Sequence, residues 1–138
     1  SNTEFEESLA KLKAQKMKSL ILDLRGNTGG YLNIAAELSN QFLKKDMTIV
    51  YTEGDKSPKQ IFNTDKNGKF TDGKLIILID EGSASASEIV SGAVQDWDRG
   101  ILIGRRSFGK GLVQRPFNLP DGSQVRLTTA RYYTPTGG

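Results

Sequence analysis

Amphipathic stretches alternate with short apolar runs along this chain, and three of the stretches have helical periodicity. Residues 5–16 place Phe5, Leu9 and Leu12 on one face, and a second set of apolar positions runs from Leu32 to Leu43. Residues 83–97 carry the clearest stripe, formed by Ala86, Ile89, Val90, Ala93, Val94 and Trp97. We therefore predict three helices.

The apolar runs predict buried strands at residues 19–24, 74–80 and 101–103, and residues 47–53 are strand-like. Residues 54–74 are polar and hold Asn67-Gly68, a hairpin turn signal. Residues 113–119 and 123–133 flank Pro120-Asp121-Gly122 and predict an antiparallel hairpin. The order of elements predicts an α/β domain with a largely parallel sheet and a C-terminal β-hairpin.

Composition removes several classes of chemistry. The 138 residues suit one domain and include no cysteine and no histidine, so a thiolate nucleophile, a thiolate zinc site and a Ser-His-Asp triad are all excluded. The net charge of +3 comes from interspersed residues of both signs and does not indicate a nucleic-acid partner. No segment approaches the roughly 18 apolar residues of a membrane span. A base in this chain must be Lys, Asp, Glu or Tyr.

A serine-rich segment joins the second apolar strand to the third helix. Ser83, Ser85 and Ser87 alternate with alanines there. One serine would satisfy helix capping, which is the simpler interpretation, but three exceed that need. The free N–H groups of a helix N-terminus also suit an oxyanion. A serine at this place needs a base before it can act as a nucleophile.

Two glycine-rich segments supply candidates for that base and for the oxyanion site. Lys110 lies between Gly109 and Gly111; an exposed loop lysine is the simpler interpretation, and the spacing of a phosphate-binding loop is missing. A lysine acts as a base only when neutral, and burial can bring the ordinary lysine pKa of about 10.4 down to near 7. Gln114 is placed to orient the amine. The turn at residues 25–30 either joins strand to helix or aims N–H groups at a carbonyl oxygen.

Four motifs, in order, resemble those of the tail-specific, or carboxyl-terminal processing, serine peptidases. They are Leu22-Asp23-Leu24-Arg25-Gly26-Asn27-x-Gly29-Gly30, Gly82-Ser83-Ala84-Ser85-Ala86-Ser87-Glu88-Ile89, Ser107-Phe108-Gly109-Lys110-Gly111-x-Val113-Gln114 and Arg131-Tyr132-Tyr133-Thr134-Pro135-Thr136-Gly137. The resemblance covers nearly the whole chain. Thr28 stands where many relatives have proline.

The resemblance implies a role for each matching residue. Ser85 becomes the nucleophile, Lys110 the general base and Gln114 the residue that orients the lysine. The oxyanion donors are the Ala86 N–H and one from Gly29 or Gly30. Asp96 matches an acidic residue of the family, for which we expect a structural role. The implied fold is the crotonase-like spiral of the Clp-type peptidases, and no metal or cofactor is implied.

The resemblance also implies an exported enzyme, in the periplasm or cell envelope, that cleaves polypeptides near their carboxyl termini. The family usually adds a PDZ domain, which these residues lack, so we expect residues 1–138 to be a single catalytic core domain excised from a longer protein. A face left uncovered would favour a homodimer. Two alternatives stay open: a non-catalytic binding module on the same scaffold, and a crotonase-type enzyme acting on an acyl thioester. Neither requires Ser85 and Lys110 together.

Overall fold

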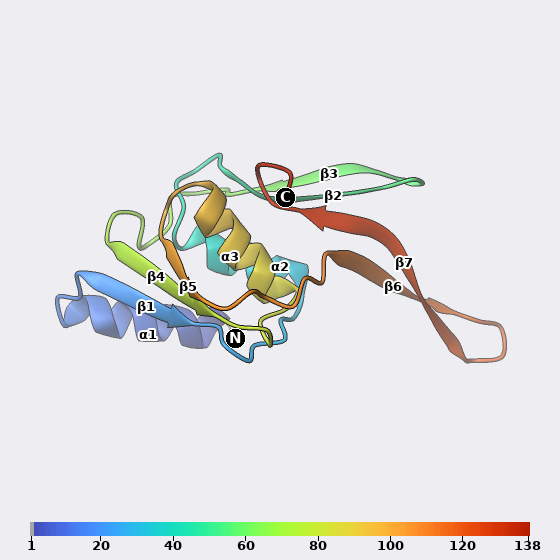
Figure 1. Ribbon diagram of the computed structural model, residues 1–138, viewed down its shortest axis with the longest axis horizontal. Coiled ribbons are helices and arrows are strands. Elements are labelled where there is room, and N and C mark those ends of the chain that lie inside the picture. Colours follow the sequence, from blue (N-terminus) through green and yellow to red (C-terminus); the bar gives the residue numbers. More distant parts are fainter. Residues whose placement is uncertain (1) are drawn as a thin grey trace.

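The computed structural model describes residues 2–138, and its centre is a parallel sheet of three strands. These are β1 (Ser19–Asp23), β4 (Lys74–Ile79) and β5 (Ile101–Gly104), in the spatial order β1-β4-β5. The register places Ile21 beside Ile76 and Ile76 beside Ile101. Each strand coincides with one of the predicted apolar runs, and the carboxyl ends of all three lie at one edge (Figure 1).

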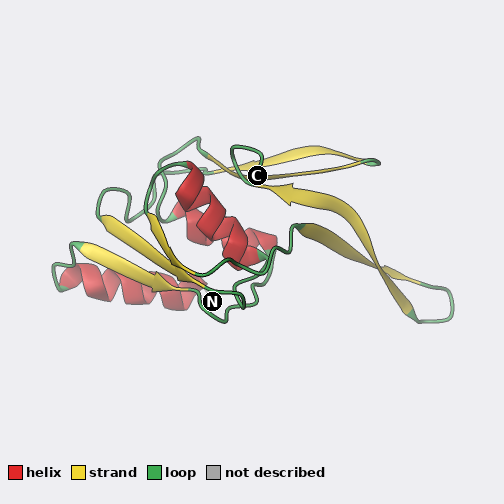
Figure 2. Ribbon diagram, in the orientation of Figure 1, coloured by secondary structure: helices red, strands yellow, loops and turns green. Residues whose placement is uncertain are grey.

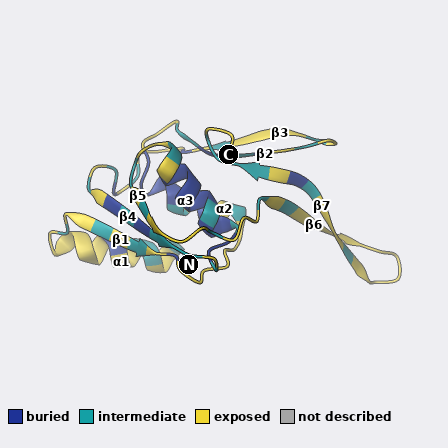
Figure 3. Cartoon of the chain, in the orientation of Figure 1, coloured by how far each residue is buried: buried dark blue, intermediate teal, exposed yellow. Residues whose placement is uncertain are grey.

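Three helices cover one face of this sheet. They are α1 (Asn2–Ala14), α2 (Leu32–Asn40) and α3 (Ala86–Asp96). Leu75 and Ile77 of β4 join a buried core whose helical members include Leu9, Ala35, Ile89, Val90, Ala93 and Val94. Figure 3 shows α3 as the most deeply buried helix, as its apolar stripe predicts. The other face of the sheet stays open, with Ile21 and Ile101 more than 60% exposed.

A second, antiparallel sheet lies on the far side of α2 and α3 (Figure 2). It contains β2 (Thr48–Gly54), β3 (Ser57–Asn63), β6 (Leu112–Asn118) and β7 (Gln124–Tyr133), in the order β3-β2-β7-β6. The predicted C-terminal hairpin is confirmed as β6 and β7, which extend away from the rest of the domain (Figure 1). The fold is α/β, with one parallel and one antiparallel sheet among the described residues.

The polar stretch after β2 holds the main differences from the sequence-based expectations. β3 was not predicted, because its segment Ser57–Asn63 lacks an alternating apolar pattern. The hairpin that it forms with β2 turns at residues 55–56, so the turn expected at Asn67-Gly68 is wrong as a hairpin. Gly68 instead passes so close to the backbone of α2 that a Cβ would lie 2.2 Å from the Asn40 oxygen.

Candidate active site

The three serines before α3 have different surroundings. Ser83 is fully buried, donates its hydroxyl to the Leu24 carbonyl oxygen (2.7 Å) and accepts the Asp80 N–H (3.0 Å). Ser87 is 4% exposed and donates to the carbonyl oxygen of Asn27 (2.9 Å). Ser85 alone of the three lines the pocket between α3 and the antiparallel sheet, which is described below. The structure therefore separates two structural serines from one that a substrate can reach.

Ser85 has an unusual backbone. It is the N-cap residue of α3, with φ 54° and ψ −113°. A positive φ is costly for a residue with a side chain, and such backbone strain persists only where the surroundings hold it. Two backbone N–H groups, those of Glu88 and Ile89, donate to the Ser85 carbonyl oxygen (2.9 and 3.0 Å). The turn exposes the side chain at the end of β4 and the start of α3.

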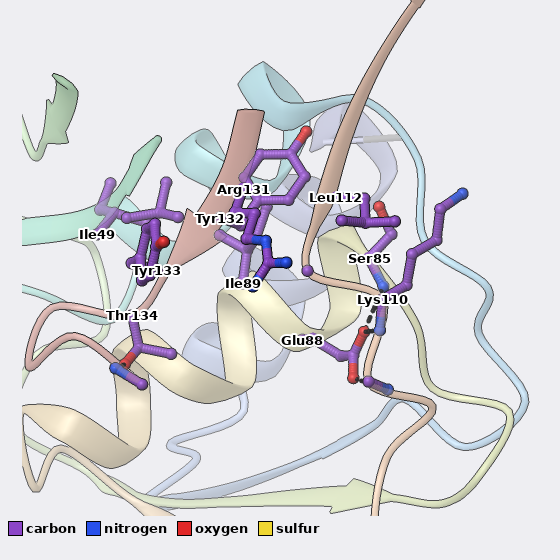
Figure 4. A pocket seen from close by; sticks show the side chains of 14 residues that line it. Ile49, Ser85, Glu88, Ile89, Lys110, Leu112, Arg131, Tyr132, Tyr133 and Thr134 are labelled. Carbon is purple, nitrogen blue, oxygen red and sulfur yellow. Dashed lines mark hydrogen bonds between the residues drawn. The ribbon is translucent and has the colours of Figure 1, made fainter. Parts of the chain in front are cut away.

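Glu88 connects the serine segment to the lysine segment. Its Oε2 accepts the N–H of Ser85 (2.8 Å) and the N–H of Lys110 (2.9 Å). Its Oε1 accepts the Ser107 hydroxyl (2.8 Å) and the Gly109 N–H (2.5 Å). Figure 4 shows this carboxylate between the two segments. One side chain thus fixes the backbones of both residues of the expected dyad.

Lys110 and Ser85 line the same pocket, but their side chains do not meet. In Figure 4 the Lys110 side chain extends away from the Ser85 hydroxyl, and no hydrogen bond joins the two side chains in the described part of the chain. Gln114 is exposed on β6, opposite Thr128 of β7, and is not among the pocket residues. The structure brings Ser85 and Lys110 together through their backbones and leaves Gln114 apart from both.

The three expected oxyanion donors differ in what their N–H groups do. Gly29 has φ +92° and approaches Ser85 so closely that a Cβ would lie 2.5 Å from the Ala84 oxygen and 3.0 Å from the Ser85 Cβ. Its N–H donates to Oδ1 of Asn27 (2.9 Å). Within residues 2–138, the N–H groups of Ala86 and Gly30 have no hydrogen-bond partner. These two are the donors that an oxyanion could use in this arrangement.

Charged side chains stabilise the glycine-rich turn at residues 25–30. Arg25 donates from Nε and Nη2 to the two carboxylate oxygens of Asp23 (3.0 and 2.7 Å). These side-chain bonds, with the Arg25 N–H, lower the pKa of Asp23 from 3.8 to about 2. Asp80 accepts the N–H groups of Gly26 and Gly82 (2.8 and 2.9 Å), and the bond from Gly26 is the main cause of its lowered pKa. Asp80 thereby holds the glycine turn against the serine segment.

Asp96 lies at the other end of α3 from Ser85. It accepts the N–H and the hydroxyl of Thr136 (2.8 and 2.7 Å). Burial would raise the pKa of Asp96, but hydrogen bonds from Thr134 and Thr136 outweigh it, so the pKa is lowered. Asp96 fastens the C-terminal segment to α3, which fits the structural role expected for it.

The pocket beside Ser85 has a volume of about 520 Å³ and lies between α3 and the antiparallel sheet. Its walls are mostly apolar, and Ile89, Leu112 and Tyr132 contribute to them. Arg131 adds one cationic group (Figure 4). Residues 2–138 contain no cluster of three or more acidic side chains placed to hold a metal ion. The site is an apolar pocket with the partly exposed Ser85 among its lining residues.

Two members of the site, Glu88 and Asn27, were given no role from the sequence. Glu88 stood inside the serine motif, and its long-range partners leave no mark in the pattern of apolar positions. Asn27 stood inside a motif, without a role. A carboxylate three residues after the candidate nucleophile was the available signal for Glu88.

Comparisons with known proteins give one consistent family. The model of "Peptidase family S41" matches residues 1–138. The "Carboxy-terminal-processing protease" of Bartonella bacilliformis is 48% identical over 129 residues, which cover 93% of this chain and 30% of that protein. The "Carboxyl-terminal-processing protease" of a Picosynechococcus species is 40% identical and covers 98% of this chain and 32% of its own.

A solved structure agrees with these sequence relatives. The photosystem II D1 C-terminal processing protease superposes with a TM-score of 0.88 at 35% identity, covering 95% of this chain and 34% of that one. The chain therefore spans about a third of the length of each relative. With its full length matched by the family model, the chain belongs to peptidase family S41, whose members named above are carboxyl-terminal processing proteases.

Proposed function

We propose that this chain is the catalytic core of a serine endopeptidase that cleaves polypeptides near their carboxyl termini, with Ser85 as nucleophile and Lys110 as base. The observation that carries the proposal is the position of Ser85, which is an N-cap residue with a positive φ, lines the apolar pocket beside α3 and lies next to the unpaired N–H group of Ala86. Membership of family S41 supports the same chemistry. Neither a non-catalytic binding module nor an acyl-thioester enzyme requires a serine and a lysine whose backbone N–H groups are bound by the same carboxylate.

The reaction begins when the neutral amine of Lys110 takes the Ser85 hydroxyl proton while Oγ bonds to the scissile carbonyl carbon. The Lys110 side chain must rotate toward Ser85 for this step, and its anchored backbone keeps that rotation local. Gln114 orients the amine once the lysine has turned inward. The negative oxygen of the tetrahedral intermediate accepts the N–H groups of Ala86 and Gly30.

The second half of the reaction returns the proton. Protonated Lys110 donates to the amine of the leaving peptide as the C–N bond breaks, which leaves an acyl group on Ser85. Water then attacks the acyl carbon, gives a proton to Lys110 and releases the new carboxyl terminus. Ser85 recovers its proton from Lys110. Lys110 is exposed, so the proposed cycle requires its side chain to leave solvent as it turns toward Ser85.

The substrate of this reaction is a polypeptide, in keeping with the protease relatives. None of the helices within residues 2–138 has the length and apolarity that a membrane crossing requires. Bacterial relatives are joined by the chloroplastic "Carboxyl-terminal-processing peptidase 3" of Arabidopsis thaliana, which is 40% identical over 137 residues. For the protein that carries this chain, we propose a place outside the cytoplasm, in the periplasm or cell envelope.

Residues 1–138 form one catalytic core domain in this proposal, with the crotonase-like spiral as its fold. The remaining two thirds of the relatives' length would supply a PDZ domain and C-terminal segments. The open face of the parallel sheet, with Ile21, Ile101 and Ile103 at least half exposed, is a surface that such segments could cover. In the isolated chain the same face would favour a homodimer.

Hydrolysis of an unstructured peptide with a free carboxyl terminus tests the dyad. Ser85→Ala and Lys110→Ala should each lower kcat by about 1,000-fold or more, as removal of a nucleophile or its base does in other serine peptidases. Lys74→Ala is the matched control, because Lys74 is exposed at the opposite end of β4. If either Ser85→Ala or Lys110→Ala hydrolyses the peptide as fast as the unsubstituted chain, the proposed dyad is wrong.

A further inference from the structure

Asn27 contacts both sides of the candidate nucleophile. Its carbonyl oxygen accepts the N–H of Ala84, the residue before Ser85 (3.0 Å). The same oxygen accepts the hydroxyl of Ser87, two residues after Ser85 (2.9 Å). Ser85 is therefore flanked by two hydrogen bonds that end on one atom of the glycine-rich turn.

The side chain of Asn27 extends this connection to the glycines. Its Oδ1 accepts the Ser87 hydroxyl (3.0 Å) and the N–H of Gly29 (2.9 Å). Gly29 in turn lies against Ser85, with room for no Cβ. The distance between Ser85 and the free N–H of Gly30 is thus set by a short path through Gly29 and Asn27.

The Ser87 side chain acts on this path. It is 4% exposed, and it does not line the pocket that holds Ser85 and Lys110. Its Oγ lies within hydrogen-bond distance of both oxygens of Asn27 (2.9 and 3.0 Å). Loss of that hydroxyl leaves both oxygens with fewer donors and frees the turn to shift relative to Ser85.

We propose that Asn27 and Ser87 are positioning residues, which hold the glycine turn and the Ser85 backbone at the spacing that an oxyanion needs. This inference rests on the proposed function, because it assigns the pair a role in the reaction of Ser85. Neither residue lines the pocket of Ser85 and Lys110, and both line the neighbouring pocket of about 290 Å³ beside Gly29 and Gly30. A misplacement of about 1 Å between catalytic groups lowers a rate by about 100-fold, so a small shift of the turn is enough to matter.

Ser91 offers a matched control within the same helix. It is also 4% exposed, and its hydroxyl donates to the carbonyl oxygen of Ser87 (2.7 Å). Ser87→Ala and Ser91→Ala each remove one buried hydroxyl from α3. Only the first removes a bond to the glycine turn, so a purely structural role predicts similar effects from both variants.

The test is steady-state hydrolysis of an unstructured peptide by the whole chain, with thermal unfolding of each variant measured in parallel. Ser87→Ala should lower kcat by about 10–100-fold and change KM by less than about twofold. The distance between Ser85 and the glycine turn affects binding of the oxyanion in the transition state and not binding of the substrate. Ser91→Ala should keep both constants within about twofold. Asn27→Ala changes an exposed residue of the turn and should lower kcat by a similar factor. It replaces Ser87→Ala in the experiment if Ser87→Ala fails to fold.

Equal losses of kcat in the Ser87 and Ser91 variants would overturn the inference, as would a change confined to KM. Ser85→Ala separates this outcome from a failure of the proposed function. If Ser85→Ala hydrolyses the peptide as fast as the unsubstituted chain, the proposed function itself is wrong. If Ser85→Ala is inactive and the Ser87 and Ser91 variants behave alike, only the positioning role is wrong.

Discussion

Replacing Glu88 with glutamine exchanges one carboxylate oxygen for an NH₂ group, at the point where the serine and lysine segments are joined. The native carboxylate accepts four hydrogen bonds, two on each oxygen. The best orientation of the amide keeps its oxygen on the N–H groups of Ser85 and Lys110. The NH₂ group then faces the Ser107 hydroxyl, which can accept, and the Gly109 N–H, which cannot.

At least one backbone N–H therefore loses its partner in Glu88→Gln. Gly109 is exposed, so water can replace much of the lost bond, and we expect a stability loss of about 1 kcal/mol. Glu88→Ala removes all four acceptor contacts and should cost about 2–3 kcal/mol. The freed loop no longer holds the Lys110 backbone beside Ser85, so kcat should fall by about 10–100-fold in Glu88→Gln.

Urea unfolding and peptide hydrolysis measure the two effects on the same protein samples. Glu81→Gln is the matched control: it changes a carboxylate of the same segment that is 69% exposed and bonded to Arg105 (2.7 Å). An exposed pair of this kind contributes about 1 kcal/mol at most. If Glu88→Gln keeps the kcat of the unsubstituted chain, or if Glu88→Gln and Glu81→Gln lose kcat equally, Glu88 does not join the serine and lysine segments as we infer.

Three further predictions concern the surroundings of the site. Gly29→Ala should lower the free energy of unfolding by more than about 2 kcal/mol, because Ala would be strained at φ +92° and its Cβ would overlap the Ala84 oxygen. Gly30→Ala has open space around the added Cβ and should change that free energy by less than about 1 kcal/mol. Urea unfolding measures both, and equal losses in the two variants would contradict the prediction. The folded pKa of Asp23 lies below its unfolded value, so its contribution is complete above about pH 4 and is lost as the pH falls through 2. Asp23→Asn should flatten the stability–pH curve in that window, and an unchanged slope in acid unfolding would count against it. Asp96→Ala should lower the melting temperature by a few degrees while kcat of the folded enzyme stays within about twofold, and a large loss of kcat would show a role in the reaction.

Elements with a strong apolar pattern could be predicted from the sequence. β4 and α3 bury most of the residues that their patterns select. The expectation that β1 and β5 are buried strands is wrong for one face of the sheet, where Ile21, Ile101 and Ile103 are at least half exposed. β3 was missed because an edge strand with exposed side chains needs no apolar alternation. Its pairing with β2 depends on hydrogen bonds between main-chain N–H and C=O groups, which do not show in the pattern of side chains.

The site was predictable as a set of segments and not as a set of contacts. Parallel strands bring the residue 25–30 turn and the serine segment to one edge of the sheet. The choice of Ser85 over Ser83 and Ser87 rested on resemblance, and it agrees with the hydrogen bonds that the other two hydroxyls donate to the carbonyl oxygens of Leu24 and Asn27. Glu88 was missed because three of its four partners, in the segment from Ser107 to Lys110, lie 19 to 22 residues away.

Identification of the residue that becomes covalently modified tests the central claim most directly. A peptidyl fluorophosphonate reacts with an activated serine hydroxyl, and digestion followed by mass spectrometry locates the adduct. We predict a single adduct on Ser85, lost in Ser85→Ala and formed far more slowly in Lys110→Ala. Modification of Ser83 or Ser87 instead, or a rate that does not depend on Lys110, would contradict the proposed Ser85–Lys110 dyad.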